Sequence, residues 1–206
     1  MRAEATRQLL LDTARALMEH NGSASVGLVE LSAASGVSNG SIYHHFGSKD
    51  GVLAAVLVDA VAKYQAAASA LLDLHHDDLA GGVAAMIEHR LRWARDNRAV
   101  AALLLEQRHL VVSPQWRDEL KASSGAFIER CRHWLEHLAE IDALARIPIE
   151  LAHPIVFAPA EEIARLWLRE QLTGDPMAFA GPLAAAAVAA LCALPQNPLP
   201  LEQDPR

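Results

Sequence analysis

Short polar side chains are concentrated between residues 38 and 45 of this 206-residue chain. They supply hydroxyl, amide and imidazole groups and belong to Ser38, Asn39, Ser41, Tyr43, His44 and His45. Val37, Ile42 and Phe46 interrupt them with side chains suited to a protein core. Such polar groups form hydrogen bonds with the base edges and phosphates of a nucleic-acid duplex. The segment therefore predicts a helix with one face packed on the protein and the other directed at DNA.

Two short helices are expected to hold this surface. The pattern predicts one helix over 27–34 and another over 38–46, joined by a short turn at Gly36. The hydroxyl of Ser38 is suited to accept a hydrogen bond from a free N–H in the first turn of the second helix. Helices of this length joined by such a turn cross at a steep angle, as in a helix-turn-helix motif. The second helix can then enter a major groove.

The run GVSNGSIYHHFGSKD, residues Gly36 to Asp50, resembles the signature of the TetR family of transcriptional regulators. The resemblance extends from Leu10 to Leu57. It implies contacts to base edges or the nearby groove from Asn39, Ser41 and His44. It also implies contacts towards the sugar-phosphate backbone from Tyr43, His45 and Lys49. The chain departs from the family at Gly27, where such helices often begin with Ser or Thr, so one hydroxyl contact to phosphate is missing.

The remaining chain predicts an all-α protein of about nine helices, because 52% of its residues are hydrophobic but only 5% are aromatic. Helical periodicity extends over residues 4–20, 48–74, 79–96, 98–111, 114–139, 160–172 and 177–194. On the first helix it predicts an apolar stripe of Leu9, Leu10, Ala14, Leu17 and Met18. The proline-rich stretch 147–159 fits either a kinked helix or an irregular lead-in. We expect a DNA-binding domain at 1–48, a ligand-binding and dimerisation domain at 49–195 and a disordered tail at 196–206.

The net charge of −7 excludes a protein that coats nucleic acid by charge alone. Residues 1–50 carry four basic and five acidic side chains, so DNA binding must depend on shaped contacts. Two cysteines are too few for a disulfide framework. The sequence has no uninterrupted apolar run of membrane-spanning length. We expect a cytoplasmic protein without a membrane partner.

The resemblance also implies a small-molecule effector between the middle helices. Mostly apolar candidates for lining such a cavity are Tyr64, Met86, Trp93, Leu103, His109, Trp116, Phe127, Trp134, Phe157 and Trp167. Polar candidates for orienting a ligand are His89, Arg90, Glu106, Arg108 and His133. Core packing is the alternative for each apolar residue, and a solvated face is the alternative for the polar ones.

Dimerisation follows from the geometry of DNA, since two recognition helices must reach grooves about 34 Å apart. Members of the family dimerise through their last two helices. In this sequence those helices are the segments 160–172 and 177–194, the second of which is rich in alanine. A helix buried inside a monomer is the alternative.

Metal and cofactor sites are not predicted. His75, His76, Asp77 and Asp78 are possible ligands, but adjacent side chains on one helix diverge, so we interpret them as a loop between helices. We expect a regulator, in particular a repressor that a small, largely apolar ligand releases from a palindromic operator. An activator with the same DNA-binding helix is the first alternative. An enzyme that uses His109 and His133 is the second, although we find no nucleophile or base at workable spacing, and we predict no catalytic activity.

Overall fold

The computed structural model describes residues 2–22, 26–106, 114–141 and 144–194. Within these ranges the chain forms nine α-helices and one short 3₁₀ helix, and it contains no strand. The predicted all-α fold is thereby confirmed. The predicted tail at 196–206 and the part of the 98–111 helix after residue 106 lie outside the described residues.

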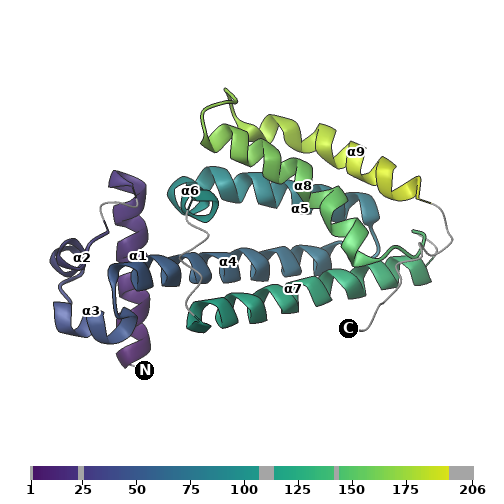
Figure 1. Cartoon of the computed structure of the whole chain (residues 1–206). Helices are drawn as coiled ribbons and strands as arrows, with labels where there is room; N and C mark the ends of the chain where they lie inside the picture. Colours follow the sequence, from purple (N-terminus) through teal and green to yellow (C-terminus); the bar gives the residue numbers. More distant parts are fainter. Residues whose placement is uncertain (1, 23–25, 107–113, 142–143, 195–206) are drawn as a thin grey trace.

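Helices α1 (Arg2–Asn21), α2 (Leu28–Ser35) and α3 (Asn39–Phe46) form an N-terminal unit at one end of the molecule (Figure 1). Its core contains the fully buried side chains of Leu10, Leu11, Ala14, Leu31 and Ile42. One predicted member of the α1 stripe is wrong, because Leu9 is 48% exposed. Leu11 is buried instead, since the inward face of α1 is centred closer to residues 10, 11, 14 and 18.

Glycines end two of these helices. Gly36 has φ +71° and donates its N–H to the carbonyl of Ser32, and Gly47 has φ +73° and donates to Tyr43. A side chain is strained at such positive φ, so glycine suits both positions. The tight turn after α2 sends the chain directly into α3.

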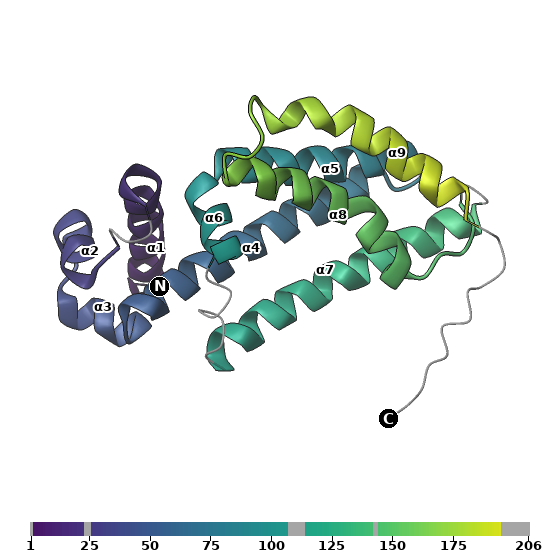
Figure 2. The same ribbon diagram turned by 45° about the horizontal axis from the view of Figure 1, so that its top comes forward.

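Helix α4 (Lys49–Leu74) extends from this unit into the larger C-terminal unit, where it packs along α7 (Pro114–Glu140) (Figures 1 and 2). By length and composition alone α4 could cross a membrane, but more than half of its most apolar window is buried inside the molecule. Such burial is typical of the central helix of a helical core.

The other helices cover this pair. Helix α5 (Leu79–Asp96) packs against α8 (Ile149–Leu168) and α9 (Ala180–Cys192), and α6 (Arg98–Glu106) contacts α1. A 3₁₀ helix over Pro176–Phe179 leads into α9. The contacts of α6 and α4 with α1 connect the two units.

The proline-rich stretch belongs to α8, and the sequence boundaries there were wrong. Pro154 and Pro159 both lie inside α8, which ends at Leu168 rather than at residue 172. Each proline lacks the N–H that a helix requires, and α8 bends along its length (Figures 1 and 2). The last helix begins at Ala180, because Pro176 starts a 3₁₀ turn first.

Candidate functional site

Helix α3 is held in place by N-caps at its own start and at the start of α4, and by the packing of its inner face on the core. The Ser38 hydroxyl accepts a hydrogen bond from the backbone N–H of Ser41 at 3.3 Å, and the Ser48 hydroxyl accepts from Gly51 at 3.0 Å. Ile42 is fully buried and Phe46 is 6% exposed. The predicted cap at Ser38 and the predicted core side of the helix are both present.

The outer face of α3 is open to solvent. Tyr43 is 64% exposed, Ser38, Asn39, His44 and Lys49 are also exposed, and Ser41 and His45 are partly buried. All seven predicted DNA-contact residues therefore lie on or beside one accessible helix. The imidazoles of His44 and His45 lie edge to face, with centroids 5.9 Å apart. The helix itself contains no acidic residue, so a phosphate meets no like charge on it.

Gly27, where the sequence departs from the family pattern, lies at the start of α2. Gly27 is the N-cap of α2 and provides no side-chain hydrogen bond to it. A Cβ at this position would lie 2.0 Å from a carboxylate oxygen of Glu30. The Glu30 side chain occupies the space that a Ser or Thr side chain would need, so glycine fits here while Glu30 keeps this rotamer.

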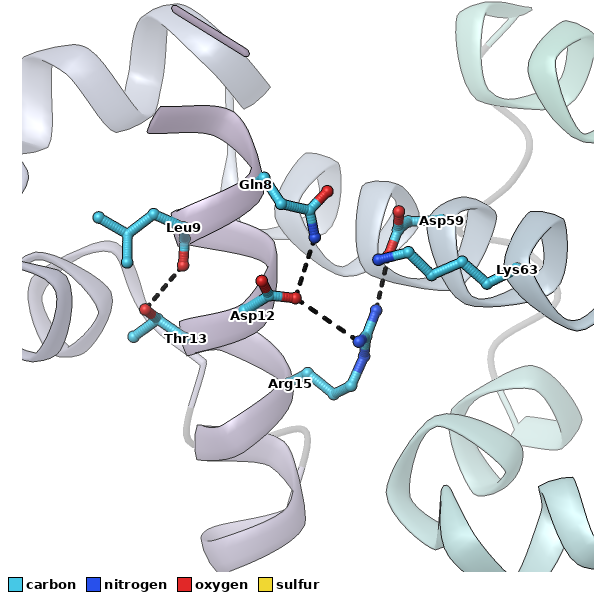
Figure 3. A network of polar contacts seen from close by, with 7 residues as sticks. All are labelled: Gln8, Leu9, Asp12, Thr13, Arg15, Asp59 and Lys63. Atoms are coloured by element: carbon cyan, nitrogen blue, oxygen red, sulfur yellow. Dashed lines mark hydrogen bonds and ion pairs between the residues drawn. The ribbon is translucent and has the colours of Figure 1, made fainter. Parts of the chain in front are cut away.

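Polar contacts join α1 to the C-terminal unit (Figure 3). Nη2 of Arg15 lies 2.6 Å from Oδ2 of Asp59 on α4, and Nζ of Lys63 lies 2.9 Å from the same oxygen. The carboxylate of Glu19 accepts the backbone N–H of Ala99 at 3.2 Å, in the first turn of α6. These contacts connect α1 directly to α4 and α6.

A cavity of about 210 Å³ lies between α4, α5, α6, α7 and α8. Four of the predicted cavity residues line it: Tyr64, Trp93, Phe127 and Phe157. An apolar cavity of about 30 Å³ is lined by others, including Met86 and Trp134, and shares Phe157. An open groove of about 540 Å³ shares Arg90, Leu104 and Glu161 with the 210 Å³ cavity.

The other predicted cavity residues lie elsewhere. Leu103 and Trp116 are buried in the core, and the ring of Trp167 lies 4.5 Å from the guanidinium carbon of Arg98. His133 is 61% exposed, with Nε2 3.5 Å from a carboxylate oxygen of Glu129 on the same helix. His109 lies outside the described residues, as does Arg108, so the spacing of Glu106 and His109 has no structural counterpart here.

Arg90 is the basic group among the described residues of the cavity wall, which also carries the acidic Glu161. Its guanidinium lies 5.7 Å from the ring centroid of Tyr64 and 5.6 Å from that of Trp93, and its Nη2 lies 3.8 Å from Glu161. Its Nε is buried and has no hydrogen-bond partner among the described residues. The guanidinium is a charged hydrogen-bond donor, so this part of the cavity wall suits an acceptor.

Burial favours the neutral forms of two cavity residues, Tyr64 and His153, and of the neighbouring His89. It raises the pKa of Tyr64 to about 12 and lowers the pKa of His89 and of His153. His89 stacks on the Tyr64 ring, and its Nε2 lies 3.0 Å from the Tyr64 carbonyl oxygen. That nitrogen is therefore the protonated one in the neutral ring.

Several residues that line the 210 Å³ cavity were not predicted from the sequence. Gln65 and Ser124 line the cavity and are joined by a 3.1 Å hydrogen bond, and His153 and Glu161 line it from α8. The continuous helix through Pro154 and Pro159 brings His153 and Glu161 to the same wall. His153 falls in the stretch 147–159, which the sequence left open between a kinked helix and an irregular lead-in, and Glu161 falls in the predicted 160–172 helix but was not expected to line a cavity.

Three N-terminal helices with an exposed polar third helix define a helix-turn-helix DNA-binding unit. Residues 10–56 match the family model described as "Bacterial regulatory proteins, tetR family". The predicted resemblance to the TetR family is confirmed over residues 10–56. No curated protein sequence matches the chain.

Solved structures share the fold over most of the chain. The fatty acid degradation regulator FadR from Bacillus halodurans has a TM-score of 0.72 at 16% identity, over 90% of this chain and 96% of that one. FadR from Bacillus subtilis, crystallised with stearoyl-CoA, has a TM-score of 0.69 at 16% identity, over 88% of this chain and 97% of that one. The TetR-family regulator PfmR from Thermus thermophilus gives 0.68 at 22% identity, covering 87% and 97%. At these identities the likeness establishes the fold.

Proposed function

We propose that the chain is a ligand-responsive transcriptional repressor that binds a palindromic operator as a homodimer. The observation that carries the proposal is the accessible polar face of α3, held outward by Ile42 and Phe46 within a TetR-family helix-turn-helix. In this proposal residues 1–48 bind DNA, with base-edge contacts from Asn39, Ser41 and His44. Tyr43, His45 and Lys49 contact the backbone, where the N-terminus of α4 also favours a phosphate.

The proposed dimer forms through α8 and α9. Ala184, Ala187 and Leu191 of α9 face inward, whereas Ala185, Ala186, Ala189 and Ala190 are exposed. An exposed face of such small apolar side chains allows two helices to approach closely. Ala189→Arg places a charge on this face, so the variant is expected to sediment as a monomer. Ala70→Arg, at an exposed position on α4, is the matched control and is expected to remain dimeric.

The proposed effector is a small, largely apolar molecule with an acceptor group at one end. The rings of Tyr64, Trp93, Phe127 and Phe157 provide apolar walls, and Arg90 provides the donor. The complex of Bacillus subtilis FadR with stearoyl-CoA makes an acyl compound a reasonable first probe. Release of DNA requires that the effector bind one arrangement of the dimer more tightly than the other. The contacts of α1 with Asp59 and Ala99 supply the mechanical connection.

A mobility-shift titration tests DNA binding and the response to the effector separately. The wild-type chain is expected to retard a duplex from the region upstream of its own gene and not a scrambled duplex of equal length. Tyr43→Ala and Lys49→Ala are expected to weaken the complex, and full affinity in both would contradict the contact assignment. Addition of stearoyl-CoA is expected to dissociate the complex, and Arg90→Leu is expected to reduce that response. DNA binding that no acyl compound affects would reject the effector class alone.

A further inference from the structure

Two histidines and an aspartate from separate elements meet at the end of α4 far from the N-terminal unit (Figure 1). His76 and Asp77 lie in the turn between α4 and α5, and His137 lies in the last part of α7. Oδ1 of Asp77 is 2.6 Å from Nε2 of His137 and 2.8 Å from Nδ1 of His76. The two imidazoles are stacked, with centroids 3.9 Å apart. The sequence did not predict this cluster, because His137 lies 60 positions from Asp77 in the chain.

Other contacts hold the turn against α7 and do not involve these three side chains. The indole N–H of Trp134 donates to the carbonyl of His75 at 2.9 Å, and the guanidinium of Arg130 pairs with Asp73. The carboxylate of Asp78 caps α5 by accepting the N–H of Gly81 at 3.0 Å. The backbone positions of the cluster are therefore set by neighbouring residues.

We propose that His76, Asp77 and His137 bind a divalent first-row transition-metal ion, such as Zn²⁺, that bridges the α4–α5 turn and α7. Two imidazole nitrogens and one carboxylate oxygen are donors that Zn²⁺, Co²⁺ and Ni²⁺ accept, whereas Mg²⁺ and Ca²⁺ prefer oxygen ligands. Three protein ligands leave a coordination position for water.

Binding of an ion requires the side chains of the cluster to rotate. The three ligand atoms lie within 4.8 Å of one another. Tetrahedral zinc ligands at roughly 2.0–2.2 Å are about 3.3–3.6 Å apart, so the Asp77 oxygen must leave its 2.6 and 2.8 Å contacts with the two imidazoles to make room for the ion. The side chains of His76 and Asp77 are 52% and 69% exposed and His137 is 29% exposed, so they are free to rotate and an ion has access.

Metal titration of the full-length, tag-free chain tests the proposal. Co²⁺ is expected to give visible absorption bands that saturate at one ion per chain and that Zn²⁺ removes. His137→Gln is expected to weaken Zn²⁺ binding by at least about tenfold in calorimetry. His133→Gln, one turn earlier on α7 and exposed, is the matched control and is expected to bind like the wild type. Equal binding by the wild type and His137→Gln would overturn the proposal.

A melting experiment distinguishes lost ligation from lost structure. Zn²⁺ is expected to raise the melting temperature of the wild type and of His133→Gln, because the ion binds only the folded chain. In Asp77→Asn and His137→Gln the metal-free melting temperature should stay close to that of the wild type, while the increase with Zn²⁺ disappears. An equal increase in all four proteins, or none in the wild type, would refute the site. None of these readouts depends on DNA binding.

Discussion

The ion pair between Arg15 and Asp59 is the most directly testable connection between the two units (Figure 3). The two side chains are 24% and 14% exposed, and the nitrogen–oxygen distance is 2.6 Å. Hydrogen bonds to charged groups contribute about 1.5–3 kcal/mol, and exposed ion pairs about 0.2–1 kcal/mol. Because both groups are only partly shielded, we expect a coupling of about 1–2 kcal/mol.

Asp59→Asn should be more costly than this coupling. Lys63 loses its 2.9 Å partner as well, and Arg15 keeps a buried Nε that has no partner among the described residues. We expect the free energy of unfolding to fall by about 1.5–3 kcal/mol. Urea unfolding of Asp59→Asn, Arg15→Gln and the double variant gives the coupling as the departure from additivity.

A surface pair on the same helix provides the control. Arg7 and Glu4 are separated by 4.0 Å, and Glu4 is 74% exposed, so Glu4→Gln should change stability by less than about 0.5 kcal/mol. Additive effects of Asp59→Asn and Arg15→Gln would refute the reasoning. So would a loss in Glu4→Gln as large as that in Asp59→Asn.

Three further predictions concern the C-terminal unit. A Cβ on Gly82 would lie 2.4 Å from Cζ2 of Trp134, so Gly82→Ala should lower the unfolding free energy by about 1–3 kcal/mol in urea. Gly125→Ala, whose Cβ meets nothing within 4 Å, should raise it by about 0.5–1 kcal/mol, and the opposite ranking would be inconsistent with this packing. Burial raises the pKa of Cys131 to about 12, so in a Cys192→Ala variant, which lacks the exposed thiol, a thiol reagent at about pH 8 should modify Cys131 only on unfolding, and rapid labelling of that folded variant would contradict this. Burial lowers the pKa of His89, so the unfolded chain binds a proton near pH 6.5 that the folded chain binds only at lower pH. Stability should fall as the pH drops through about 6.5, and the urea midpoint of His89→Gln should depend less on pH than that of the wild type.

Local signals in the sequence were sufficient for the N-terminal unit. Ser38 caps α3 as expected and Gly36 lies in the expected turn, because both depend on neighbouring residues in the chain. The exposed face of α3 also follows from a short local pattern. Leu9 was misplaced because a stripe of leucines fits two adjacent helix faces, and only the packing of α2, α4 and α6 around α1 selects between them.

Contacts between residues far apart in the chain could not be predicted from the sequence. Asp77 and His137 are 60 positions apart, and Arg15 and Asp59 are 44 apart, so their pairing depends on how α4 packs against α7 and α1. Prolines misled the prediction in α8, since tertiary packing retains a helix that local propensity disfavours. On the cavity wall that α8 provides, Phe157 was predicted, but His153 and Glu161 were not.

Binding of operator DNA by a single-residue variant of α3 tests the central claim most directly. Fluorescence anisotropy with a labelled operator duplex should show His44→Ala weakened by about tenfold or more, as expected for loss of one base contact. His133→Ala replaces the same residue type at an exposed position on α7 and should bind as tightly as the wild type. Equal affinity of the two variants and the wild type would contradict a DNA-binding role for the outer face of α3.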